Sequence, residues 1–99
     1  MGKFEAIIKT AEYENITKAA RELGYTQANL SHIISRIETD LQITLFHRMR
    51  QGVKLTRAGK DLLSYMYKIE EDENALINAA LSYRKSMLRI GSFYSISAY

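Results

Sequence analysis

The chain has 99 residues, of which 46% are hydrophobic and 25% charged, and its formal net charge is +3. This length allows one small hydrophobic core, and because such a core leaves an isolated domain marginally stable, dimerisation would help. The absence of cysteine excludes a disulfide framework and a thiolate metal site, and no apolar run approaches membrane-spanning length, so we expect a soluble cytoplasmic protein without membrane contact.

Positive charge is concentrated in the first sixty residues. They hold ten Lys or Arg against six Asp or Glu, whereas residues 61–99 hold four against five. This placement suits a polyanionic partner at one end, although many solvated surfaces carry as much charge.

Two short helices are predicted near the start of the chain. Four apolar residues share one face of the first: Phe4, Ile7, Ile8 and Ala11. After the polar residues 12–15, a second helix is expected to begin at Thr17, whose hydroxyl can cap its first turn. It ends at Gly24, which tolerates a left-handed backbone. Its apolar face is small enough for a second helix to cross closely at a steep angle: Ala19, Ala20 and Leu23.

A third helix is predicted after Thr26, a second candidate cap. Its buried stripe has helical spacing, with Ile33 at the edge: Leu30, Ile34, Ile37 and Leu41. The opposite face carries short or hydrogen-bonding side chains and no acid at its centre: Ala28, Ser31, His32, Ser35, Arg36 and Thr39. Such a face can enter a DNA major groove and meet base edges and phosphates without repulsion.

After Leu41 the apolar pattern changes from helical to alternating. Ile43 and Leu45 precede a polar glycine-containing turn at residues 49–52, and Val53 and Leu55 follow it. This pattern predicts a short hairpin, or wing. Thr56 can then cap a last long helix over residues 57–86, which has no proline and no glycine after Gly59.

That long helix would span about 45 Å, more than a three-helix core can cover. Six of its apolar residues follow steps near 3.5 residues and, with Leu63 and Ile77 flanking them, predict a dimer interface: Leu62, Met66, Ile69, Leu76, Ala80 and Tyr83. Glu73 weakens this seam, and the acidic residues 70–73 indicate a solvated face that points away from DNA. The alternative is that Leu62, Met66 and Ile69 pack back on their own domain.

Residues 16–23 (ITKAAREL) and 26–31 (TQANLS) resemble the N-terminal domain of LysR-type transcriptional regulators. The resemblance covers roughly residues 3–91. Further matches follow in the order and at the spacing of the family motif: Ile37-Glu38, Leu41, Leu45-Phe46, Arg48, Val53-Lys54-Leu55-Thr56 and Ala58-Gly59. Two residues depart from the family pattern. Ala28 replaces a common proline, and Ser35 replaces a frequent basic residue, which removes one expected phosphate contact.

The resemblance implies a mainly α, winged helix-turn-helix fold: a DNA-binding domain at 1–56, a dimerisation helix at 57–86 and the start of a truncated effector-binding domain at 87–99. The alternating residues 88–92 would form the first strand of that last part. A small-molecule effector would bind the missing C-terminal portion, and no cofactor is expected in this chain. The implied partners are double-stranded DNA and a second copy, with a tetramer possible for the full-length protein.

The candidate DNA contacts come from the third helix and the wing: Thr26, Gln27, Ala28, Asn29, Ser31, His32, Ser35, Arg36, Arg48, Arg50 and Lys54. Gln27 lies at a helix start that favours phosphate, and glutamine can pair with adenine. Arginines beside a glycine turn can reach a narrow minor groove. The alternative is an ordinary solvated surface. With only two histidines, His32 and His47, and no cysteine, a zinc site is not expected.

These residues predict a sequence-specific DNA-binding domain that works as a dimer on an interrupted inverted repeat. The second possibility is a protein-interaction and dimerisation module with an idle DNA face. An enzyme is not expected, because the chain lacks a cysteine nucleophile, a glycine-rich phosphate loop and a Ser-His-acid set at motif spacing.

Overall fold

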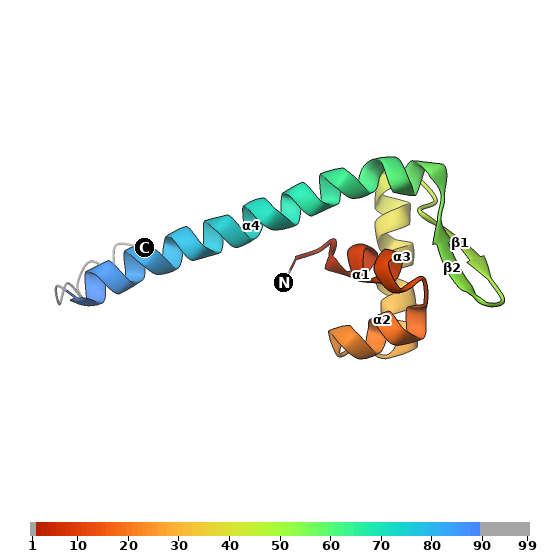
Figure 1. Cartoon of the computed structure of the whole chain (residues 1–99), viewed down its shortest axis with the longest axis horizontal. Helices are drawn as coiled ribbons and strands as arrows, with labels where there is room; N and C mark the ends of the chain where they lie inside the picture. Colours follow the sequence, from red (N-terminus) through yellow and green to blue (C-terminus); the bar gives the residue numbers. More distant parts are fainter. Residues whose placement is uncertain (1, 90–99) are drawn as a thin grey trace.

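A computed structural model describes residues 2–89, with side chains described through residue 86. In chain order the elements are α1 (Glu5–Tyr13), α2 (Ile16–Leu23), α3 (Gln27–Leu41), β1 (Phe46–Met49), β2 (Gly52–Leu55) and α4 (Arg57–Arg89). Figure 1 shows α1, α2 and α3 packed together with the β1–β2 hairpin at one side, and we call this part the head. Helix α4 leaves the head as a single long rod. The predicted winged helix-turn-helix fold with a long final helix is confirmed.

The start of α2 differs from the prediction. Asn15, not Thr17, is the cap, because its side-chain oxygen accepts a hydrogen bond from the Lys18 N–H at 2.9 Å. Ile16 packs against the core, so the helix must already include it. The predicted end is confirmed: Gly24 has a φ of 78° and its N–H returns to the last turn of α2.

Helix α3 has the predicted cap and most of the predicted buried stripe. The Asn29 N–H donates to Thr26 Oγ1 at 3.0 Å, and Leu30 and Ile34 are fully buried. The prediction is wrong for Leu41, which is 40% exposed. The chain turns away at Gln42, which ends α3 with a φ of 58°, and Leu45 fills the core instead.

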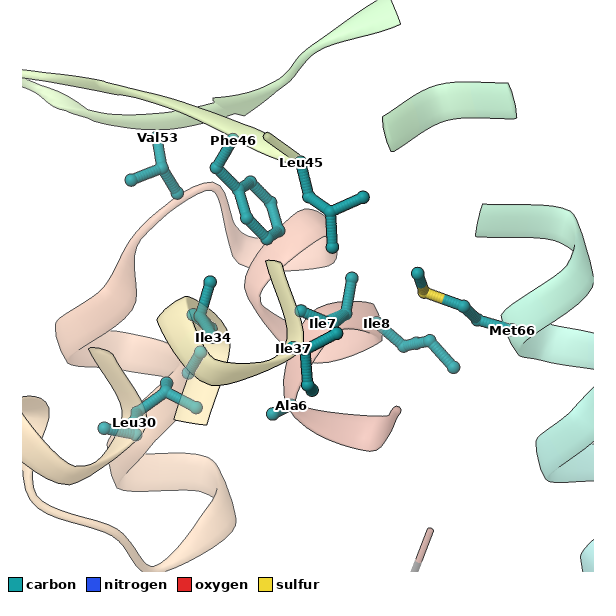
Figure 2. Close-up of a cluster of buried hydrophobic side chains, with 12 residues drawn as sticks. Ala6, Ile7, Ile8, Leu30, Ile34, Ile37, Leu45, Phe46, Val53 and Met66 are labelled. Atoms are coloured by element: carbon teal, nitrogen blue, oxygen red, sulfur yellow. The ribbon is translucent and has the colours of Figure 1, made fainter. Parts of the chain in front are cut away.

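The wing is a two-stranded antiparallel hairpin in which Phe46 lies opposite Leu55 and Met49 opposite Gly52. The predicted alternation holds only in part, because Leu45 and Phe46 are adjacent and both buried, while Ile43 is exposed. These two residues point from the base of the wing into the head (Figure 2). The wing is therefore anchored at its base.

The core joins all four helices and the wing (Figure 2). Ile7 of α1, Ile34 of α3 and Leu45 are fully buried, and Met66 reaches in from α4 toward Ile8. Met66 is only 3% exposed, so its assignment to the dimer seam is wrong. Leu62 and Leu63 are partly buried against the same core. The first part of α4 thus packs on its own head. The alternative interpretation therefore holds for Leu62 and Met66 but not for Ile69, which is 49% exposed.

Beyond Glu70, the described part of α4 is exposed throughout, from residue 71 to residue 86. The helix continues to Arg89, so Leu88 and Arg89 are helical where a strand was predicted. The rest of that predicted strand, and residues 90–99, lie outside the described residues. None of the helices within residues 2–89 has a stretch both long and apolar enough to span a membrane.

Candidate nucleic-acid interface

The outward face of α3 carries the side chains that the sequence predicts for DNA contact. Ser31 is half-buried at the side nearest the wing. The other candidates on this face are exposed: Thr26, Gln27, Ala28, Asn29, His32, Ser35 and Arg36. The Thr39 hydroxyl donates to the Ser35 carbonyl at 2.9 Å and is thereby occupied within the helix. This face can enter a groove without bringing an acidic side chain to its centre.

Ser31 and Arg48, predicted separately on the helix and on the wing, meet in the structure. Arg48 Nη1 donates a hydrogen bond to Ser31 Oγ at 2.8 Å. The guanidinium has further N–H donors, and the Ser31 hydroxyl can still donate its own proton. The bond therefore joins helix and wing into one surface and leaves both groups able to contact a ligand.

Gln27 has a partner that the sequence did not reveal. The Thr17 hydroxyl, inside the first turn of α2, donates to Gln27 Oε1 at 3.1 Å. This bond occupies one lone pair of the amide oxygen, and the NH₂ group remains a donor. Gln27 held in this way suits an acceptor such as a phosphate or a guanine edge, whereas bidentate pairing with adenine would have to share the amide oxygen with Thr17.

A groove of about 300 Å³ lies between the starts of α2 and α3 and the wing, and its lining includes Thr17, Gln27, Arg48 and Arg50. The N-terminal ends of both helices contribute partial positive charge, and the two arginines contribute full charges. Asn15 also lines it, although the sequence did not single it out. The groove combines two helix N-termini with two cations, an arrangement that suits a phosphate backbone.

Other predicted contacts lie apart from this groove. His32 and Arg36 line a second groove of about 500 Å³ together with Lys3, Tyr25 and Asp40. Lys54, which lies opposite His47 in the hairpin register, lines a third groove on the far part of the wing. Within residues 2–89, no three His, Asp or Glu side chains gather closely enough to hold a metal ion. The candidate surface is thus spread along α3 and the wing.

Glu38 holds the wing in place, a role that no local sequence pattern indicates. Its Oε2 atom accepts hydrogen bonds from the Leu45 N–H at 2.7 Å and the Phe46 N–H at 3.1 Å. At the other end of the hairpin, the Thr56 hydroxyl donates to the Thr44 carbonyl at 2.7 Å and accepts from the Gly59 N–H at 2.9 Å. Thr56 is thus the predicted cap of α4 and also ties α4 to the segment that leads into the wing.

Residues 1–60 match the family described as bacterial regulatory helix-turn-helix protein, lysR family. The HTH-type transcriptional regulator YofA of Bacillus subtilis (strain 168) is 36% identical over 96 residues, which are 95% of this chain and 33% of YofA. The chain therefore spans about a third of the length of this curated relative.

Two solved structures are similar in fold and sequence. The crystal structure of a CbnR_DBD-DNA complex superposes with a TM-score of 0.77 at 26% identity, over 81% of this chain and 92% of that chain. The BenM_DBD/benA site 1 DNA complex superposes with a TM-score of 0.73 at 27% identity, over 79% of this chain and 88% of that chain. With its first sixty residues matched by the family and its fold shared with these domains, the chain belongs to the lysR family of bacterial regulatory helix-turn-helix proteins.

Proposed function

We propose that this chain binds double-stranded DNA in a sequence-specific manner, with α3 in the major groove and the wing beside the minor groove. The observation that carries the proposal is the hydrogen bond between Arg48 and Ser31, because it joins the two reading elements into one continuous surface. Two DNA-binding domains of similar fold are named in complexes with DNA, which supports the same mode here.

On this surface the residues divide by role. Gln27, Arg48 and Arg50 around the groove at the helix starts would hold the phosphate backbone and fix the orientation of the head. Farther along α3, His32 and Ser35 are exposed. Their side chains are small, so the helix can approach the base edges closely enough for them to make contact. Ser35 supplies no positive charge, so phosphate contact there would be weaker than with a basic residue.

Replacing Arg48 by alanine is expected to weaken DNA binding about tenfold at moderate salt and to flatten the salt dependence, because one cation near the backbone is lost. Ser31→Ala, which removes only the partner of that guanidinium, should weaken binding less. Fluorescence anisotropy with a labelled duplex at several salt concentrations measures both. The matched control is Arg84→Ala, since Arg84 is exposed on the distal part of α4.

The competing function is a protein-interaction module in which the DNA surface is idle. Under that function, DNA affinity would be weak in the unchanged protein and the same in all three variants, Arg48→Ala, Ser31→Ala and Arg84→Ala. A loss confined to the first two variants would reject the interaction module as the main function.

We further propose that two copies pair through the part of α4 beyond Met66 and read an interrupted inverted repeat. The remaining seam residues are exposed in the single chain and need a covering partner: Ile69, Leu76, Ile77, Ala80 and Tyr83. Leu76 and Tyr83 are 68% and 75% exposed, which is unusual for large apolar side chains along one stripe. A two-fold dimer would require a DNA site with the same symmetry.

Changing Ile69 and Leu76 together to glutamate is expected to convert the dimer to a monomer, because four like charges would then face each other in one apolar seam. Sedimentation velocity across a concentration series measures the change. Asn78→Glu is the control, since Asn78 lies about 200° around the helix from Leu76. If the double variant sediments as a dimer like the control, the seam is wrongly assigned.

A further inference from the structure

A polar contact joins helix α4 to the start of α1. Glu70 Oε2 accepts a hydrogen bond from the Phe4 N–H at 3.2 Å, although the two residues are 66 positions apart. Phe4 is the cap position of α1, and its own side chain makes no capping hydrogen bond. Gly2 packs so closely against the Glu70 carboxylate that a Cβ there would overlap it. Glu70 is thus the cap of a helix on another part of the chain.

This contact has a clear physical basis. The first N–H groups of a helix have no partner within the helix, and the helix dipole makes that end attractive to a carboxylate. The other acidic residues of the run, at 71–73, are exposed, whereas Glu70 is half-buried. Glu70 is therefore the member of this acidic run that is used in the fold.

Glu70 lies one turn beyond Met66, the last residue of α4 that is buried in the core. A third close approach is at Gly59, where a Cβ would meet the Leu45 carbonyl. From Gly59 to Glu70 these three points span eleven residue steps of the helix, or about 16 Å. Met66, Leu62, Leu63 and Gly59 fix α4 at the core, and Glu70 adds a directed hydrogen bond one turn farther along the helix.

We propose that Glu70 is a positioning residue that fixes the angle between α4 and the head, and thereby the spacing of the two DNA half-sites that a dimer reads. This proposal rests on the proposed function. From Glu70 to Tyr83 the helix covers about 20 Å. A swing of about 10° at Glu70 would displace the distal end by about 3.5 Å, which is the rise of one base pair. A small change of angle therefore translates into a change of register on DNA.

The first test measures the angle without DNA. Lys18 on α2 and Lys85 on α4 are exposed, and because the chain has no cysteine, Lys18→Cys and Lys85→Cys provide two unique spin-label sites. Double electron–electron resonance is recorded on labelled protein diluted with unlabelled protein, so that the distances within one chain dominate. Glu70→Ala should broaden the distance distribution. Glu71→Ala is the matched control, since Glu71 is exposed, and its distribution should stay as narrow as in the unchanged sequence.

The second test measures spacing on DNA. A library of inverted half-sites separated by increasing numbers of base pairs is selected with each protein and sequenced. In Glu70→Ala the preference for the best spacing over its neighbours should fall about threefold, in proportion to the loss of one charge-assisted hydrogen bond. Glu70→Gln keeps an acceptor oxygen, so its spacing preference should lie between those of Glu70→Ala and the unchanged sequence. Affinity for an isolated half-site should be unchanged in all variants, because the reading surface is untouched.

The two tests separate the possible failures. An unchanged distance distribution in Glu70→Ala overturns the role of Glu70, whatever the DNA result. A broadened distribution with an unchanged spacing preference overturns the link between angle and spacing. A protein of unchanged sequence that binds no half-site contradicts the proposed function, while the distance measurement still decides whether Glu70 fixes the angle.

Discussion

Replacing Glu38 by alanine is expected to lower the free energy of unfolding by about 2–4 kcal/mol. A single carboxylate oxygen of Glu38 accepts both the Leu45 and Phe46 N–H groups, and its removal leaves two donors unpaired at the partly buried base of the wing. Because Leu45 and Phe46 are themselves buried in the core, the loss would affect the head as well as the hairpin. Urea denaturation followed by circular dichroism measures the change.

The matched control for this prediction is Glu22→Ala, since Glu22 is exposed on α2. Its substitution should change stability by less than about 0.5 kcal/mol. Glu38→Gln retains an acceptor oxygen without the charge and should lie between the two. Equal stability of Glu38→Ala and Glu22→Ala would show that Glu38 does not hold the wing.

Replacing Gly52 by alanine is expected to cost about 2–5 kcal/mol, from backbone strain together with steric overlap. Gly52 has a φ of 149°, a conformation that side chains oppose. An added Cβ would also meet the Glu14 carbonyl, whose oxygen accepts the Val53 N–H at 3.2 Å. The substitution would therefore push the wing away from the link between α1 and α2.

Gly24→Ala provides the comparison for Gly52→Ala. Gly24 also has a positive φ, of 78°, but open space surrounds the position of a Cβ there. Only the cost of the left-handed conformation remains, about 1–2 kcal/mol. Thermal unfolding of both variants tests the difference. A Gly24→Ala variant as unstable as Gly52→Ala would mean that the contact with Glu14 contributes nothing.

The elements of this fold could be predicted because their signals are local. Thr26 and Thr56 precede their helices by one residue, and Gly24 follows its helix directly. The stripe from Leu30 to Ile37 repeats within two turns. Each of these patterns depends on neighbours in the sequence, so no knowledge of the tertiary structure is needed to recognise them.

The errors arose where tertiary contacts decide between similar local patterns. Asn15 and Thr17 are both good caps, and the packing of Ile16 against the core selects the first. Met66 fits the helical spacing of a dimer seam as well as it fits a core, and only the three-dimensional arrangement places it in its own head. Leu41 fits the stripe of α3, yet the chain turns away there.

The candidate site was predicted as a set of residues and not as a geometry. Arg48 and Ser31 were both candidates, but their hydrogen bond joins residues 17 positions apart, and no local pattern encodes it. The partners of Gln27 and Glu38 are likewise found in other elements. Long-range hydrogen bonds of polar side chains carry no periodic signal, so their roles became visible only in the folded chain.

We propose that α3 and the wing form one surface that reads DNA sequence. Selection of duplexes from a random pool with this protein, followed by titration of the selected site and a shuffled duplex of equal composition at several salt concentrations, tests this proposal. We expect the selected site to bind at least about a hundredfold more tightly, and both affinities to fall as salt rises, the pattern of phosphate contact combined with base readout. An affinity that depends on neither sequence nor salt would contradict it.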